Sequence, residues 1–236
     1  MLELSVAYSL ILLVIWTPRP WQVLLWVLTA ASILAITCMS FEGLEAMGLC
    51  SANFLCSLWA VGLSAAIAAA AVLLAERFHT LHAPGTPYLF VRHYGVYAVW
   101  AWVQQVLLQC FCLSRLMRLL RYAPSAAAIA AVMFAVVHLP SPVLTVVTLT
   151  CGMAACLLFL RYRNLYTIAL AHAILGTSVA ICVPAPIIHN MRIGRSYLTY
   201  VPHPAPLAQR SIAPLVRQSI DPLAQQSTPS PISPQP

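Results

Sequence analysis

Seven apolar segments separated by short breaks constrain the fold of this chain more than any other feature. They cover residues 3–17, 21–39, 53–75, 94–119, 125–139, 142–160 and 164–183. Hydrophobic residues make up 61% of the chain and charged residues only 7%, whereas a soluble domain carries about 25% charged residues. A run of about 20 apolar residues crosses a bilayer as a helix. We therefore predict an all-α, polytopic transmembrane helical bundle of about seven spans.

Changes in composition along the chain predict three parts. A polar loop that contains proline and histidine ends the N-terminal transmembrane helices, residues 1–93, and a transmembrane core follows over residues 94–183. Eleven of the 18 prolines fall in residues 184–236, together with an eight-residue repeat that begins as PLAQRSIA. Such a segment cannot bury enough apolar surface to fold alone. We predict a disordered Pro-rich C-terminal tail, with a docking segment for a partner as the alternative.

The placement of arginine predicts the orientation in the membrane. All 12 basic residues are arginines. Those that flank the core lie at two turns, one after the fourth segment and one between the sixth and seventh (Arg115, Arg118, Arg121, Arg161 and Arg163). The hairpin between these turns, residues 139–142, carries no charge. Basic residues are enriched on the cytoplasmic side of a membrane, so we predict that both arginine-rich ends are cytoplasmic.

Acidic residues are scarce, and this limits the chemistry of the core. The chain has five carboxylates, and none lies between Arg77 and Ile220. Its eight cysteines are spread singly, without the spacing of metal ligands, and small buried hydrophobic side chains are the simplest interpretation. We predict membrane lipids as partners, no nucleic acid, no metal and no cofactor.

Polar side chains inside the apolar segments are the candidates for function. The fourth, fifth and seventh segments contain glutamines and histidines (Gln104, Gln105 and Gln109; His138 after Phe134; His172). A single residue of this kind often makes an interhelical hydrogen bond worth on the order of 1 kcal/mol. Five of them on nearby spans favour a shared pocket, because each is costly in hydrocarbon without partners. A rise of 1.5 Å per residue places Gln104 and His172 at similar depths, with His138 nearer the outer face.

These residues resemble the motifs of the CPBP family of intramembrane peptidases, which includes CAAX proteases, bacteriocin-processing proteins and proteins like the type II CAAX prenyl endopeptidases. That family carries E-E-x-x-x-R, then F-x-x-x-H, then H-x-x-x-N or a variant. The matching stretches here are Gln104-Gln105-x-x-x-Gln109, Phe134-x-x-x-His138 and His172-x-x-x-Gly176. The resemblance covers about residues 94–183. It implies an integral, multi-pass protein of a bacterial cytoplasmic membrane.

The resemblance also implies roles for these positions. In the family, the first Glu and the first His activate a water that attacks a peptide bond, while the second His and the Asn stabilise the oxyanion. Carried over, the catalytic positions are Gln104, Gln105, His138 and His172, and the positions that support the substrate or the oxyanion are Gln109, Phe134 and Gly176. Here amides replace both acids and the Arg, and Gly replaces the Asn. An amide does not accept a proton at neutral pH, so we interpret the site as a paired-Gln variant.

Two functions remain open from the sequence. In the first, the protein is an endopeptidase for membrane-associated or lipidated substrates. His138 is its general base, the paired glutamines orient the water and His172 donates to the oxyanion; Cys110 or Cys112 as nucleophile is a weaker alternative. In the second, the protein is a non-catalytic relative that acts as a membrane receptor, a scaffold or a bacteriocin-immunity-type binding protein. A transporter is disfavoured because no inverted repeat or pair of broken helices is visible.

Overall fold

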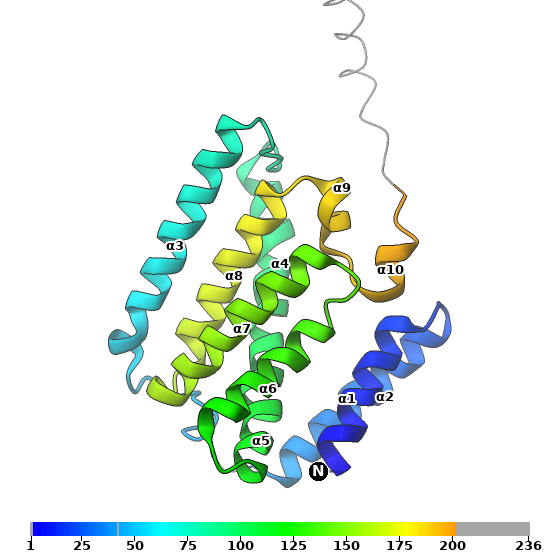
Figure 1. Ribbon diagram of the computed structural model, residues 1–236, viewed down its shortest axis with the longest axis vertical. Helices are drawn as coiled ribbons and strands as arrows, with labels where there is room; N and C mark the ends of the chain where they lie inside the picture. The colour runs from blue at the N-terminus through cyan, green and yellow to red at the C-terminus, as the bar shows by residue number, and fades with distance from the viewer. Residues whose placement is uncertain (1, 42, 202–236) are drawn as a thin grey trace, which may run out of the picture. The chain divides into compact units, whose positions relative to one another are not determined.

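The computed structural model describes residues 2–41 and 43–201, and all regular secondary structure in them is helical (Figure 1). The helices are α1 Leu2–Trp16, α2 Trp21–Met39, α3 Phe54–Arg77, α4 Pro87–Gln105, η1 Val106–Leu113, α5 Ser114–Leu119, α6 Ala123–Val136, α7 Pro142–Tyr162, α8 Leu165–Cys182, α9 Ala185–Ile188, η2 His189–Met191 and α10 Gly194–Leu198. The prediction of an all-α fold is confirmed.

Five stretches are long and apolar enough to cross a membrane: α2, α3, the continuous run Pro87–Leu119, α7 and α8. The helices at the other two predicted places are shorter, with 15 residues in α1 and 14 in α6. A 14-residue helix is about 21 Å long, whereas the hydrocarbon core is about 30 Å thick. The chain is therefore a multi-pass membrane protein, with five long apolar helices among the residues that the structure describes, where about seven spans were predicted.

Small side chains bring the core helices together. α8 packs against α3 and α4, and α6 packs against α7; Figure 1 shows α8 between α3 and α7. The buried residues of α6 are all alanines (Ala126, Ala127, Ala130, Ala131 and Ala135). Small residues let helix backbones approach closely in a membrane, where van der Waals packing drives association. The alanine face of α6 therefore explains its close packing.

The run Pro87–Leu119 departs from α-helical geometry in its middle. η1 is an eight-residue π-helix that continues directly from α4 into α5. Gln105 is the last residue of α4, and Gln109 lies inside η1. Stretches of π-helix are rare and often occur at functional sites. The glutamines thus lie where the backbone itself is unusual.

The two arginine-bearing turns lie at one end of the bundle (Figure 1). The loop that contains Met47 and Gly48 contacts the helices next to both turns. The Cys110 thiol of η1 donates a hydrogen bond to the carbonyl of Met47 over 3.3 Å. The backbone N–H of Leu165, at the start of α8, donates to the carbonyl of Gly48 over 2.9 Å. Gly48 has a φ of +68°, and a Cβ there would lie 2.8 Å from the carbonyl oxygen of Arg163, so this approach requires glycine. That this end faces the cytoplasm stays a prediction.

The prediction of a disordered tail over residues 184–236 is wrong for its first part. After Pro184 the chain forms the short helices α9, η2 and α10. Ile188 is almost completely buried, and the backbone N–H of Gly194 donates to the carbonyl of Leu139 over 2.7 Å. Packing against the bundle supplies the buried surface that this composition cannot supply alone. Residues 202–236, which hold the repeat, lie outside the described residues.

Candidate functional site

Two glutamines and a histidine form a chain of hydrogen bonds between η1, α4 and α8. The Nε2 amide of Gln109 donates to Oε1 of Gln105 over 3.0 Å. The Nε2 amide of Gln105 donates to Nδ1 of His172 over 2.6 Å. Gln105 is 2% exposed and Gln109 is 0% exposed. These bonds offset much of the cost of burying the amides.

The hydrogen-bond partners of the two histidines favour opposite tautomers. With the Gln105 amide oriented so that its nitrogen faces Nδ1 of His172, Nδ1 accepts and the proton of the neutral ring lies on Nε2. Nδ1 of His138 lies 2.7 Å from the backbone carbonyl oxygen of Phe134. That oxygen only accepts, so Nδ1 of His138 carries the proton and Nε2 keeps a lone pair. One histidine thus offers a donor and the other an acceptor.

The Phe134 ring holds the two imidazoles near each other. Its centroid lies 4.9 Å from that of His138 and 5.8 Å from that of His172, edge-on in both cases. A Cβ on Gly152 of α7 would lie 3.2 Å from Cδ1 of Phe134, so the glycine makes room for the ring. The short α6 ends at Val136, so His138 lies in the turn that follows this helix.

A cavity of about 760 Å³ joins these groups. Six of the seven residues identified from the motifs line it (Gln104, Gln105, Phe134, His138, His172 and Gly176). The seventh, Gln109, lies behind Gln105 in the hydrogen-bond chain. Gln104 lines the cavity and makes no hydrogen bond to the described part of the chain. Its amide is therefore available to a ligand.

The cavity extends between α3 and α7. Both helices line it, with α8 as its floor, and α3 and α7 make few contacts with each other. Several of its apolar side chains are also exposed on the outside of the helices, among them Trp59 and Leu63 of α3 and Leu157 of α7. On a membrane helix, such side chains face lipid. The cavity is therefore bordered by exposed apolar side chains of α3 and α7.

Sequence reasoning missed several lining residues. Trp100 and Tyr97 come from α4, and Asn190 comes from the segment that follows α8. A Cβ on Gly176 would collide with the hydroxyl and the ring of Tyr97. The missing Asn of the third motif could have indicated that another side chain fills this volume. Nothing local in the sequence indicates Asn190, because its place depends on the packing of residues 185–198.

Asn164 positions the helix that carries His172. Its Oδ1 accepts the backbone N–H of Thr167 over 3.2 Å and thereby caps α8. Its Nδ2 donates to the carbonyls of Cys50 and Ala52 over 3.1 and 3.0 Å. Asn164 is completely buried. The start of α8 is thus tied to the loop before α3, about two turns from His172.

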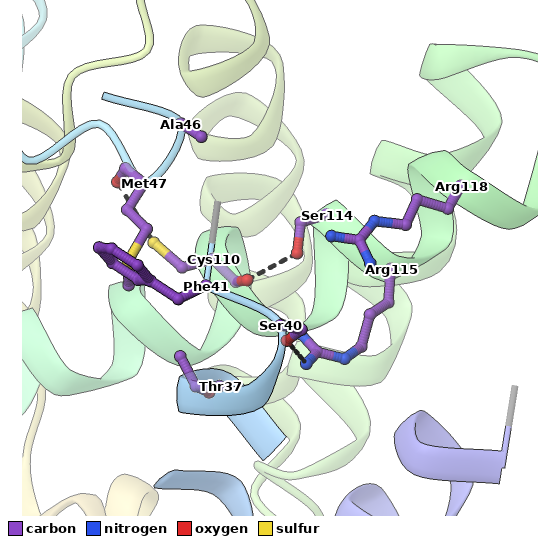
Figure 2. A pocket seen from close by; sticks show the side chains of 9 residues that line it. All are labelled: Thr37, Ser40, Phe41, Ala46, Met47, Cys110, Ser114, Arg115 and Arg118. Atoms are coloured by element: carbon purple, nitrogen blue, oxygen red, sulfur yellow. Dashed lines mark hydrogen bonds between the residues drawn. The ribbon is translucent and has the colours of Figure 1, made fainter. Parts of the chain in front are cut away.

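The cysteines proposed as alternative nucleophiles lie away from this cavity. Cys110 lines a second, small cavity of about 30 Å³, beside Ser114 and Arg115 (Figure 2). Cys112 is buried in the apolar core. The cysteine alternative therefore has no geometric support. Across residues 2–41 and 43–201, no three His, Cys, Asp or Glu side chains gather in a way that could hold a metal ion.

Comparison with known proteins supports the resemblance. Residues 87–177 match the family model described as "Type II CAAX prenyl endopeptidase Rce1-like". No curated protein matches the chain, and no solved structure does. The matched segment begins at the first residue of α4 and ends one residue after Gly176, so it includes every motif position. Residues 87–177 of this multi-pass membrane protein are therefore an Rce1-like domain of the CPBP family.

Proposed function

We propose that the protein is an intramembrane endopeptidase that hydrolyses peptide bonds of membrane-associated or lipidated substrates. The Rce1-like domain makes a protease possible and implies peptide substrates. The observation that supports the proposal is that His138 and His172 line one cavity, each with a hydrogen-bond partner at Nδ1 that favours a different tautomer. Attack of water on an amide needs one group that accepts a proton and one that donates to the developing oxyanion.

The proposed reaction needs no carboxylate. Nε2 of His138 takes a proton from a water whose oxygen attacks the carbonyl carbon of the substrate. The Nε2–H of His172 donates to the carbonyl oxygen as it becomes negatively charged. The C–N bond then breaks, and His138 returns the proton to the leaving amine nitrogen. The Gln104 amide orients the water, while Gln105 and Gln109 hold His172 in its donor tautomer.

The shape of the cavity supports substrates that enter from the lipid. Its volume of about 760 Å³ is within the usual range for ligand sites. Its walls are mainly apolar, and α3 and α7, which line it, make few contacts with each other. We propose that all seven apolar helices lie in the membrane, so that an apolar chain next to the cleaved bond reaches the histidines sideways.

A second candidate function is binding without catalysis, as a membrane receptor or scaffold. One observation favours it: none of the lining residues in the described part of the chain is a carboxylate. Neutral amides and imidazoles in an apolar cavity hydrogen-bond a peptide or a lipid end whether or not they cut it.

Mass spectrometry of protein termini tests the proposal. Membranes would be compared from cells with the intact protein, without it, and with His138→Ala or His172→Ala at equal amounts of folded protein. We expect N-termini that depend on the intact protein, and a fall in their formation of 10²-fold or more in each variant. His93→Ala is the matched control, because His93 is exposed on α4 and does not line the cavity. Identical termini with and without the protein would reject the peptidase and leave binding as the function.

A further inference from the structure

The position of Tyr97 suggests a role for a residue outside the three motifs. Gly176 lies one helical turn after His172 on α8, so a side chain there would share the face of His172. Tyr97 of α4 occupies that volume. A Cβ on Gly176 would collide with the Tyr97 hydroxyl and would lie 2.6 Å from Cζ of its ring. Tyr97 can thus occupy this position only because residue 176 is a glycine.

The Tyr97 hydroxyl is available for hydrogen bonding. It forms no hydrogen bond with any residue among 2–41 and 43–201. Tyr97 is half-buried and lines the cavity that contains Gln104, His138 and His172. A hydroxyl among apolar side chains costs free energy unless it is hydrogen-bonded. An unpartnered hydroxyl on the cavity wall therefore points to a ligand as its partner.

We propose that the Tyr97 hydroxyl is a second donor to the substrate carbonyl oxygen, next to the Nε2–H of His172. This inference rests on the proposed peptidase function and adds a catalytic residue to it. The phenol remains protonated near neutral pH, so it donates a hydrogen bond and transfers no proton. Tyr97 of α4 would thereby supply the hydrogen-bond donor that the family motif has as Asn at the position of Gly176.

Tyr97→Phe is the main test, because it removes one oxygen and keeps the ring that packs on Gly176. Rates would be measured on a peptide that spans a cleavage site identified from the termini. We expect kcat to fall on the order of 10²-fold with little change in KM, because the donor acts on the developing oxyanion. Tyr94→Phe is the matched control. Tyr94 is on the same helix and packs on Phe90 and His93, outside the cavity.

An exchange of the two positions provides a second test. Gly176→Asn alone should lose activity, because the new side chain collides with Tyr97. Tyr97→Ala frees that volume, so the double variant Tyr97→Ala with Gly176→Asn should be at least tenfold more active than Tyr97→Ala alone. The proposal is overturned, with the peptidase function intact, if Tyr97→Phe cuts like the intact protein while His172→Ala does not cut. If the intact protein yields no dependent termini, the peptidase function is overturned and this proposal with it.

Discussion

Two cavities in the described part of the bundle contain polar groups of different character. The large cavity is lined by neutral amides and imidazoles, of which Gln105 and His172 are hydrogen-bonded to each other. The small cavity, near the end of the bundle, holds the cation Arg115 (Figure 2). Its guanidinium donates to Ser40 Oγ over 2.8 Å and to the Phe111 carbonyl over 3.2 Å. A full charge costs more in hydrocarbon than a neutral amide, so the chain confines charge to a helix end and keeps its deep site neutral.

The contacts of Arg115 indicate a structural role for the small cavity. The guanidinium lies 3.9 Å from the centre of the Phe111 ring, and its Nε lies 3.5 Å from Glu3 of α1. Ser40 follows the end of α2. One side chain thus connects the first two helices to the Rce1-like domain. We infer that substitutions at the large cavity change activity most, and that substitutions at the small cavity change stability most.

The largest expected effect tests the large cavity. Gln105→Met keeps the side-chain volume and removes both hydrogen bonds of Gln105, so nothing holds His172 in its donor tautomer. We expect the initial rate of cleavage, at equal amounts of folded protein, to fall by about 10²-fold. An unchanged rate would show that the Gln105–His172 bond is not part of the site.

The next effect tests the small cavity. Arg115→Met removes two charged hydrogen bonds, and we expect the free energy of unfolding to fall by about 3 kcal/mol, measured by denaturant titration in detergent. Glu3→Gln is the control; Glu3 is 61% exposed, so its loss should cost less than about 1 kcal/mol. A loss of cleavage in folded Arg115→Met as large as that in Gln105→Met would break the distinction between the two cavities.

A smaller effect tests whether the Phe134 ring positions the two histidines. Gly152→Ala places a methyl group against the Phe134 ring, and overpacking of this kind costs roughly 1–3 kcal/mol. We expect lower thermal stability together with a several-fold lower rate, because the ring contacts both histidines. Gly62→Ala in α3 is the control, since a Cβ there meets nothing within 4 Å; it should change neither quantity. If Gly152→Ala and Gly62→Ala had the same thermal stability and cleavage rate, Phe134 would not be positioning the histidines.

The smallest effect concerns Cys110. Cys110→Ala removes a thiol that lines only the small cavity and loses one weak hydrogen bond to Met47. We expect an unchanged cleavage rate and a loss of stability below about 1 kcal/mol. A large loss of cleavage in the folded variant would revive the cysteine nucleophile.

The sequence predicts local features well, since hydropathy and motif spacing act over short distances. The apolar segments correspond to helices α1 to α8. Gln104, Gln105, His138 and His172 line one cavity, and their catalytic roles stay predictions. The partners could not be predicted, because they depend on how distant helices pack. The Gln105–His172 bond joins residues 67 positions apart, and Tyr97 meets Gly176 from another helix. The ordered segment 185–198 was missed because it packs against distant parts of the chain, as in the hydrogen bond from Gly194 to Leu139.

In the proposed peptidase, entry of the substrate between α3 and α7 would reverse the usual supply of reactants for hydrolysis. A soluble hydrolase works in an excess of water and waits for its substrate. Here an apolar substrate would arrive by two-dimensional diffusion and be concentrated by its partition into the bilayer, while water becomes the scarce reactant in an apolar cavity. Hydration of the cavity would then limit turnover. Selectivity would depend as much on which chains dissolve in the membrane as on the sequence around the cleaved bond.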